Sequence, residues 1–222
     1  MKIEKLEKEP ITKLGVLLAI LLFVIYVGEA FFVAVFPDEM YYFVSSLGSI
    51  FVILCAILFF KNRLKRDITA LKNNNKAYAK FIITNMFMMY GVYYAVSIIC
   101  VLILGSADAS ANQTALETMP SAYLIFSALI FAPIVEELLF RGSIRRIIKN
   151  DVLFVIISGL IFGSLHVVME PTWFEFIFRG LPYVTLGMYF SYVYVRTENI
   201  TVSMICHFIQ NVLAVSMMFL IK

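Results

Sequence analysis

Apolar residues fill most of this chain in long runs, and short polar segments separate the runs. Roughly 20 apolar residues cross a bilayer as a helix, which also satisfies its own backbone hydrogen bonds. Barrel strands would instead alternate polar and apolar positions. The pattern therefore predicts an all-α fold, a polytopic transmembrane bundle of about seven spanning helices, at Leu14–Phe36, Phe43–Phe60, Phe81–Leu104, Tyr123–Phe140, Val152–Val168, Trp173–Val195 and Thr201–Ile221.

Composition supports this interpretation. Hydrophobic residues make up 62% of the chain and charged residues 15%, whereas soluble domains average about 45–50% apolar and about 25% charged residues. Little length remains for a soluble domain, so residues 1–222 are expected to form a single membrane domain in contact with the lipid bilayer. The three cysteines lie in apolar runs without CxxC spacing, which indicates neither disulfides nor a thiolate metal site.

The charged residues between the runs indicate the orientation. The second connection is rich in lysine and arginine, whereas the first and third connections carry acidic residues and neither of those basic types. Positively charged loops stay cytoplasmic, so the amino terminus is expected inside and the carboxyl terminus outside. The net charge of +3 resides in loops rather than on one face of a folded domain. No nucleic-acid partner is therefore predicted.

A few ionisable residues interrupt the apolar runs, where burial is costly and the residue usually has a function. In the fourth run, Arg141 follows Glu137 by four residues and is its expected ion-pair partner. Glu136 then points about 100° away. It is free to face a cavity as a general base, and the alternative is a solvated carboxylate at the helix end.

The only two histidines, His166 and His207, lie in the fifth and seventh runs. Each shares a helix face with a residue four positions away, Phe162 and Asn211 respectively. Their convergence with Glu136 would create a site that holds and activates water, although a lone histidine is more often a packing residue. Helical rise places Glu136 and His207 at similar depths, but His166 roughly 20 Å deep. The fifth helix must therefore be displaced or tilted.

Two further charges lie inside apolar runs, Glu29 in the first and Arg179 in the sixth. Helical rise places both residues at a depth of roughly 10 Å from the outer face of the membrane. An ion pair between the two helices is therefore predicted. In the alternative, Arg179 pairs with Glu175 one turn earlier, while Glu29 makes hydrogen bonds alone or is protonated.

Proline, glycine and aromatic residues suggest details of packing. Pro133, three residues before Glu136, is expected to bend the fourth helix and free backbone carbonyls near the site. Gly159 and Gly163 would let a neighbouring helix approach closely. Aromatic residues such as Tyr183 are interpreted as packing or interface residues rather than a cofactor site.

Three short motifs together resemble a known family. They are Glu136-Glu137-Leu138-Leu139-Phe140-Arg141 (EExxxR), Phe162-Gly163-Ser164-Leu165-His166 (FxxxH) and His207-Phe208-Ile209-Gln210-Asn211 (HxxxN). This set, in order and on separate apolar runs, resembles the CAAX protease and bacteriocin-processing (CPBP, or Abi) membrane proteases. By this resemblance, residues 121–222 are the catalytic helices, and residues 1–120 are amino-terminal helices without motifs.

The resemblance implies intramembrane endoproteolysis. Glu136 would activate water, supported by Glu137 and Arg141. The site would be completed by His166, His207 and Asn211. The cavity would be supported by Phe140 and Phe162. Two versions of the mechanism stay open. In the first, one zinc ion bound by His166, His207 and Glu136 would lower the pKa of its bound water. Without a cofactor, Glu136 and one histidine would orient the water while the other histidine and Asn211 stabilise the oxyanion. The metal-free version is favoured, because a neutral amide is a poor zinc ligand.

Other functions remain open at this point. A bacteriocin self-immunity or signalling protein would carry the same motifs, and an ion-coupled transporter would also bury carboxylates, although no internal repeat is evident. The expected substrate is a peptide or membrane protein whose identity is unspecified, and the expected location is a prokaryotic plasma membrane. No oligomeric state follows from the sequence.

Overall fold

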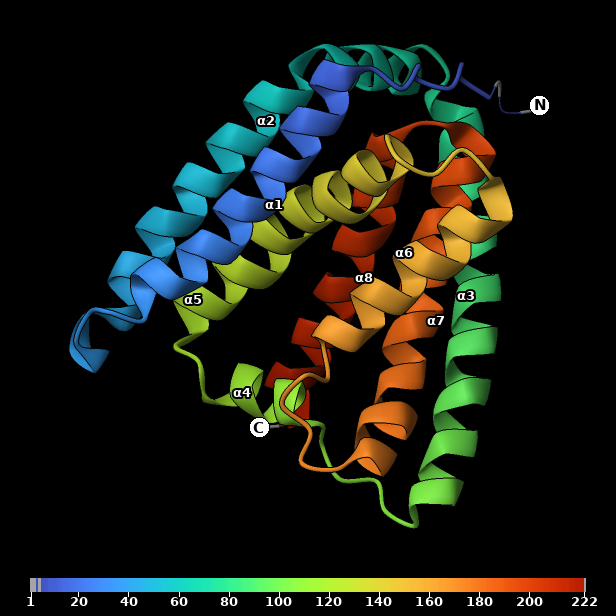
Figure 1. Ribbon diagram of the computed structural model, residues 1–222. Helices are drawn as coiled ribbons and strands as arrows, with labels where there is room; N and C mark the ends of the chain where they lie inside the picture. Colours follow the sequence, from blue (N-terminus) through green and yellow to red (C-terminus); the bar gives the residue numbers. More distant parts are fainter. Residues whose placement is uncertain (1–2, 4, 222) are drawn as a thin grey trace.

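A computed structural model describes residue 3 and residues 5–221, and all the regular elements in these ranges are helices (Figure 1). The predicted all-α fold is therefore confirmed, and each of the seven apolar runs is largely helical. The elements are α1 (Lys13–Val33), η1 (Asp38–Met40), α2 (Tyr41–Asn73), α3 (Asn75–Leu104), α4 (Ala111–Thr118), α5 (Ser121–Phe126), η2 (Ser127–Ser143), α6 (Asp151–Leu165), α7 (Trp173–Thr197) and α8 (Ile200–Ile221).

Five helical segments within the described residues are long and apolar enough to cross a membrane: Lys13–Val33, Tyr41–Asn73, Asn75–Leu104, Ser121–Ser143 and Ile200–Leu220. The segment Ser121–Ser143 comprises α5 and η2, which follow one another without a break. Helix α6 is apolar but has only 15 residues. The protein is therefore a multi-pass membrane protein, and its seven predicted segments differ in how well each could span a bilayer alone.

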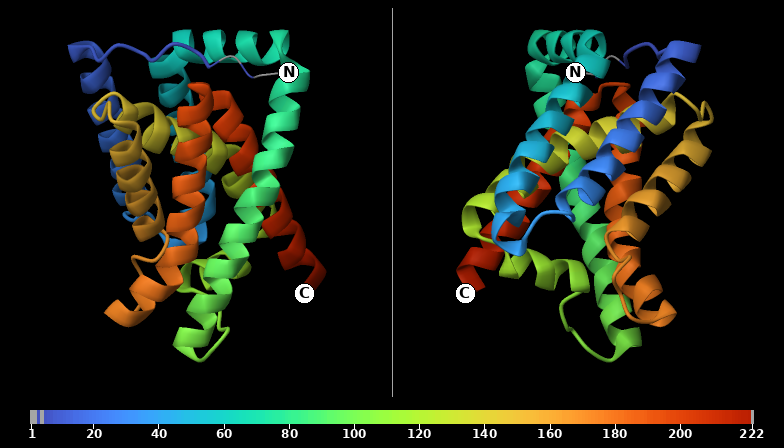
Figure 2. Two further views of the ribbon diagram at one scale, coloured as in Figure 1. Left: turned by 90° about the vertical axis from the view of Figure 1, so that its right-hand side faces the viewer. Right: turned by 60° about the vertical axis from the view of Figure 1, so that its left-hand side comes forward.

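The basic segment after Phe60 was expected to be a loop, and that expectation is wrong. Helix α2 continues to Asn73, and α3 begins at Asn75. Figures 1 and 2 show the last turns of α2 lying across one end of the bundle. Here Arg63 and Asp67 are both buried and pair at i,i+4 spacing. Charged residues that were expected to form a loop therefore stabilise a continuation of α2.

The amino-terminal segment is tied to the same end of the bundle. The Leu6 amide donates to the Thr197 carbonyl over 3.0 Å, and the Lys8 ammonium lies 2.8 Å from Asp151. The carboxylate of Glu9 lies 2.9 Å from the buried Arg63 guanidinium. These contacts join the amino terminus to α2, α6 and α7.

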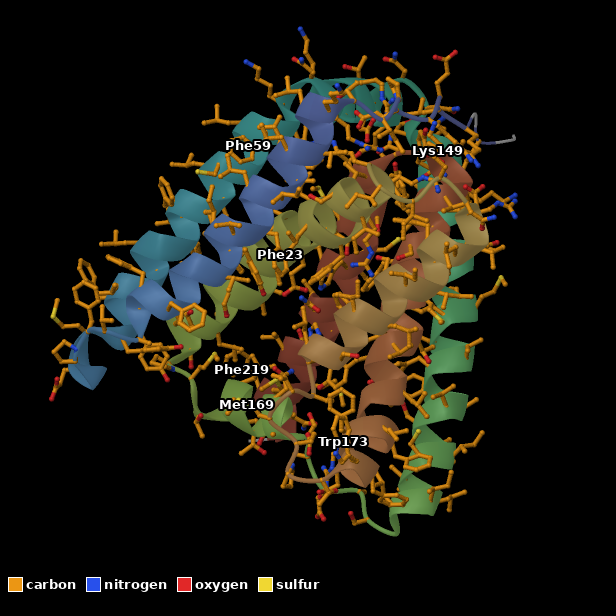
Figure 3. All side chains as sticks on the ribbon, in the orientation of Figure 1. Phe23, Phe59, Lys149, Met169, Trp173 and Phe219 are labelled. Atoms are coloured by element: carbon orange, nitrogen blue, oxygen red, sulfur yellow. The ribbon has the colours of Figure 1, made fainter. Side chains whose placement is uncertain are left out.

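The two ends of the bundle differ in charge. We call the end with the amino-terminal segment the basic end, and Figure 3 shows Lys149 there and Trp173 at the opposite end. That opposite end, the acidic end, carries Glu39, Asp108, Glu117, Glu170 and Glu175. Cytoplasmic segments are enriched in lysine and arginine, so this separation fits the predicted orientation with the amino terminus inside.

Helices α6 and α7 approach each other closely through glycine. A Cβ atom on Gly163 would lie 2.5 Å from the Val184 backbone nitrogen, and one on Gly159 would lie 2.8 Å from that of Met188. Neither position can hold a larger side chain without moving a backbone. The glycines thus act in helix packing, and they place the end of α6, where His166 lies, against α7.

Candidate active site

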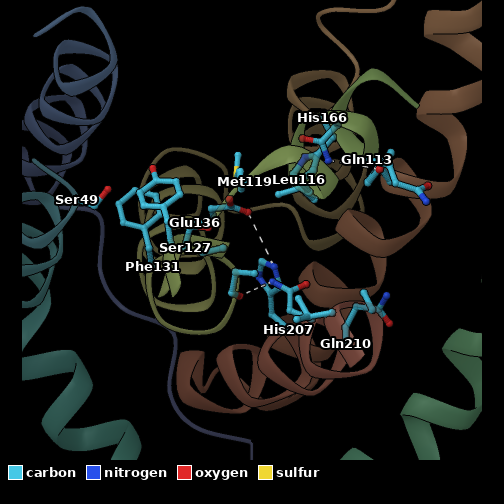
Figure 4. Close-up of a pocket in the computed structure, with 18 of the residues that line it drawn as sticks. Ser49, Gln113, Leu116, Met119, Ser127, Phe131, Glu136, His166, His207 and Gln210 are labelled. Carbon is cyan, nitrogen blue, oxygen red and sulfur yellow. Dashed lines mark hydrogen bonds and ion pairs between the residues drawn. The ribbon is translucent and has the colours of Figure 1, made fainter. Parts of the chain in front are cut away.

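The predicted site residues gather around one cavity of about 950 Å³. Glu136, His166, His207 and Asn211 line it, and Figure 4 shows Glu136 close to His207. Glu137 and Arg141 are fully buried and are not among its lining residues. The cavity extends from these residues to α4 at the acidic end.

Glu137 and Arg141 form a buried ion pair. Their Oε1 and Nη1 atoms are 3.0 Å apart, and both side chains have an exposed fraction of 0%. The other carboxylate oxygen, Oε2, accepts a hydrogen bond from the Ser203 hydroxyl over 2.5 Å. This pair matches the spacing-based prediction, and it connects η2 to α8.

The Arg141 guanidinium also reaches α7. It donates to the Ser191 hydroxyl over 3.2 Å and to the Gly187 carbonyl over 2.7 Å. Its carbon atom Cζ lies 4.7 Å from the ring centre of Phe162 and 5.4 Å from that of Phe190. Aromatic faces and fixed acceptors offset part of the cost of burying this charge. Arg141 therefore holds together η2, α6 and α7 behind the cavity.

The contacts of His207 determine its tautomer. Its Nδ1 atom lies 3.0 Å from Oε1 of Glu137, and a carboxylate paired with arginine only accepts hydrogen bonds. Nδ1 therefore carries the hydrogen. In the neutral ring Nε2 is then an acceptor, and only a second proton would make it a donor. Nε2 lies 4.0 Å from Oε2 of Glu136.

His166 has a different partner. Its Nδ1 atom lies 2.8 Å from the Phe162 carbonyl oxygen. A carbonyl can only accept, so Nδ1 carries the hydrogen and the neutral ring keeps an acceptor lone pair on Nε2. The ring stacks on Tyr183, with 4.9 Å between centroids. Each neutral ring therefore offers an acceptor at Nε2, and the two would differ only if His207 took up a second proton.

The expected depth mismatch of His166 is resolved by the path of α6. Figure 1 shows α6 inclined across α7, and the helix ends at Leu165, so His166 is its capping residue. The rings of His166 and His207 both contact Phe162, with centroid distances of 4.4 Å and 5.8 Å. The two histidines therefore meet at one level.

Asn211 and Pro133 are linked through the backbone of η2. This segment has π-helical bonding, in which the amide of residue i+5 donates to the carbonyl of residue i. Pro133 has no amide hydrogen, so the Ala128 carbonyl lacks its donor. The Asn211 side-chain nitrogen donates to that carbonyl over 2.8 Å. The prediction that Pro133 frees a carbonyl near the site is thus supported.

Glu136 faces the cavity without a hydrogen-bonding partner among the described residues. Its Oε2 atom is buried and makes no hydrogen bond to them. A buried carboxylate oxygen normally has a partner. In this position, water or a substrate group inside the cavity would satisfy it.

The two phenylalanines expected to support the cavity have unequal positions. Phe162 lines the cavity, whereas Phe140 does not. Phe140 packs edge-on against Phe162 from behind, with 5.6 Å between ring centres. Phe140 thus supports the cavity indirectly, through Phe162.

Several residues at the site were not found from the sequence. Ser203 lies one turn before His207, and Ser191 one turn after Gly187, so their helical spacing is the signal that could have identified them. Tyr183 was interpreted as a packing or interface residue. Instead it lines the cavity beside His166, with its hydroxyl 3.1 Å from that of Ser110.

The predicted ion pair between Glu29 and Arg179 is wrong. Arg179 lies 3.5 Å from Glu170 and 3.7 Å from Glu175 and donates to two backbone carbonyls. Glu29 instead packs against Gly48 of α2. Arg179 thus pairs with Glu170, which lies on the loop after α6. Depth along a helix could not predict this partner.

A metal site of three protein ligands does not form in the described residues. Nε2 of each histidine would be available to a metal, because Nδ1 is already bonded. However, no group of three or more histidine, cysteine or acidic side chains is close enough to hold an ion in this part of the chain. The arrangement does not fit a metal, and the steps below use protein groups alone.

Comparison with known proteins finds similarity over part of the chain. Residues 118–213 match a family described as Rce1-like, type II CAAX prenyl endopeptidase Rce1-like. Over 96 residues the chain is 32% identical to the uncharacterized protein YyaK of Bacillus subtilis (strain 168). The aligned region covers 40% of this chain and 32% of that protein. The match thus spans about a third of the relative's length. No solved structure matches the chain significantly.

Proposed function

Residues 118–213 match the Rce1-like family of type II CAAX prenyl endopeptidases, and on the basis of this similarity we propose that the protein is an intramembrane endopeptidase. The proposed substrate is a membrane-associated or leader-bearing peptide or protein. One observation carries the proposal: the buried Oε2 atom of Glu136 has no hydrogen-bonding partner among the described residues and lies 4.0 Å from Nε2 of His207. Peptide hydrolysis uses a base to activate water and a donor to stabilise the oxyanion.

The charges behind the site define its protonation. Glu136, Glu137 and Arg141 together carry one excess negative charge, which is unfavourable in a buried region. The proposed hydrolysis needs a donor at Nε2 of His207, and one additional proton on that ring, beside Glu137, makes the group neutral. In this state Glu136 is an ionised base, and Nε2 of His207 is a donor.

The two histidines then have separate roles. Glu136 and the acceptor Nε2 of His166 orient a water molecule, and Glu136 takes one of its protons as the oxygen attacks the scissile carbonyl carbon. The carbonyl oxygen becomes an oxyanion, which accepts a hydrogen bond from Nε2 of His207. The second amide hydrogen of Asn211 is the other proposed donor. Glu136 finally gives its proton to the leaving amine nitrogen as the carbon–nitrogen bond breaks.

The experiment compares the parent protein with Glu136→Gln in lipid nanodiscs. Fluorogenic peptides with hydrophobic segments and a farnesylated CAAX peptide serve as substrates, and mass spectrometry locates the cut. Loss of the base is expected to lower the rate by about 10²–10⁴-fold. Glu39→Gln, an exposed carboxylate outside the cavity, is the matched control and should leave the rate unchanged.

The same variant separates proteolysis from a scaffold role. A bacteriocin self-immunity or signalling protein that acts by binding alone would keep its biological activity in Glu136→Gln. Full activity of that variant would remove the endopeptidase assignment.

A further inference from the structure

The cavity holds a second carboxylate that the proposed hydrolysis does not use. Glu29 of α1 lines the cavity together with Tyr26 of the same helix. Glu136 lines the same cavity. The two carboxylates are therefore near enough to contact one bound peptide.

The surroundings of Glu29 place its carboxyl group at the wall of the cavity. A Cβ atom on Gly48 would lie 2.8 Å from both Cγ and Oε1 of Glu29, so the glycine leaves room for this side chain between α1 and α2. Ser45 lies beside the carboxyl group, and its hydroxyl is 2.7 Å from that of Tyr123. Ser45 and Ser49 of α2 also line the cavity, and Figure 4 shows Ser49 on the opposite side of Glu136 from Gln113.

Glu29 has no cation of its own. Its Oε1 atom is buried without a hydrogen bond, and no ion pair among the described residues includes it. Arg179, the partner predicted for it from the sequence, instead contacts Glu170 and Glu175. An unpaired carboxylate within a membrane protein is costly, and such residues usually bind a ligand or ion.

The acidic end of the cavity favours a cationic ligand. Glu117 of α4 also lines this part of the cavity, and its carboxylate accepts a hydrogen bond from Gln113 over 2.9 Å. Oriented carboxylates at the mouth of a low-dielectric cavity attract positive charge. Most of the other residues that line the cavity are apolar or aromatic, which suits hydrophobic residues that flank one basic residue.

We propose that Glu29 forms a subsite for the side chain of a single lysine or arginine in the peptide substrate. The Ser45 and Ser49 hydroxyls complete this subsite, and the hydrophobic residues of the peptide occupy the rest of the cavity. This assignment rests on the proposed function, because it describes a peptide bound beside Glu136. It predicts a preference for a basic residue within a hydrophobic segment.

The experiment measures binding separately from cleavage. Two fluorescent hydrophobic peptides differ only in one residue, arginine or its neutral near-isostere citrulline. Both are titrated onto full-length Glu136→Gln protein in nanodiscs of neutral lipid. The arginine peptide is expected to bind at least tenfold more tightly, and the difference should shrink at high salt because it is electrostatic.

Variants of Glu29 then test the residue itself. Adding Glu29→Gln should remove the preference for arginine, Glu29→Asp should retain part of it, and Glu39→Gln should leave it unchanged. Equal binding of the two peptides by protein that retains Glu29 would overturn the assignment. So would an arginine preference that survives Glu29→Gln, or an equal loss of both peptides with a lower melting temperature.

Cleavage by protein with an intact Glu136 distinguishes the two proposals. If it binds the arginine peptide preferentially but cleaves neither peptide, the subsite holds and the endopeptidase assignment fails. If it cleaves both peptides at equal rates and binds them equally, the endopeptidase assignment holds and the subsite fails.

Discussion

Nδ1 of His207 lies 3.0 Å from Oε1 of Glu137. Glu137 is held in turn by Arg141 and Ser203, so the His207 ring is oriented through a carboxylate that does not line the cavity. The adjacent glutamates of the first motif therefore have different positions. Glu137 supports the histidine from behind, and Glu136 faces the cavity.

Removing one member of the buried pair should strongly destabilise the fold. Arg141→Leu leaves Glu137 buried without its cation, which typically costs about 3–5 kcal/mol. Unfolding of the detergent-solubilised protein by denaturant measures this. Lys8→Ala, which removes a partly exposed ion pair with Asp151, is the control and should cost less than about 1 kcal/mol. Similar losses for the two variants would contradict the assigned importance of Arg141.

The close approach of α6 and α7 predicts opposite effects at two glycines. Gly163→Ala would place a Cβ atom 2.3 Å from Cγ2 of Val184. We expect a loss of about 1–3 kcal/mol from overpacking and lower activity because His166 moves. Gly91→Ala in α3 meets no atom within 4 Å and should stabilise its helix by up to about 1 kcal/mol. Thermal unfolding of both variants tests this, and an unchanged Gly163→Ala protein would disagree with the observed contact.

The contact between Asn211 and Ala128 predicts a compensating pair. Asn211→Leu removes the side-chain donor from the Ala128 carbonyl and should cost about 1–3 kcal/mol. Pro133→Ala restores an amide hydrogen at the position that donates to that carbonyl in π-helical bonding. The double variant should therefore recover part of the stability but not the activity, if Asn211 also serves the oxyanion. Strictly additive losses in stability would argue against the contact.

Metal removal tests the choice between the two hydrolytic versions. If protein groups alone activate the water, then purified protein stripped with a chelator should cleave its peptide at the original rate. The metal content, measured by mass spectrometry on the same sample, provides the comparison. One tightly bound zinc ion per chain, together with activity lost on chelation and restored by zinc, would support the metal-dependent version instead.

Much of the site could be predicted from residue order. The i,i+4 spacing of Glu137 and Arg141 predicted their pairing and left Glu136 to the cavity, because the geometry of one helix determines which neighbours meet. The missing amide hydrogen of Pro133 predicted a free carbonyl for the same reason. The scarcity of charge in long apolar runs also determined the all-α membrane fold, since a bilayer allows few alternatives.

Contacts between helices were decided only by the tertiary structure. The level of His166 depends on how α6 crosses α7, and the partners of Glu29 and Arg179 depend on which helices are neighbours. Depth along a helix gives one coordinate and leaves rotation, tilt and neighbours open. The sequence by itself thus determined the helices and the residues that carry chemistry. Packing across helices decided their partners, including the unpaired position of Glu29, because those contacts join residues far apart in the chain.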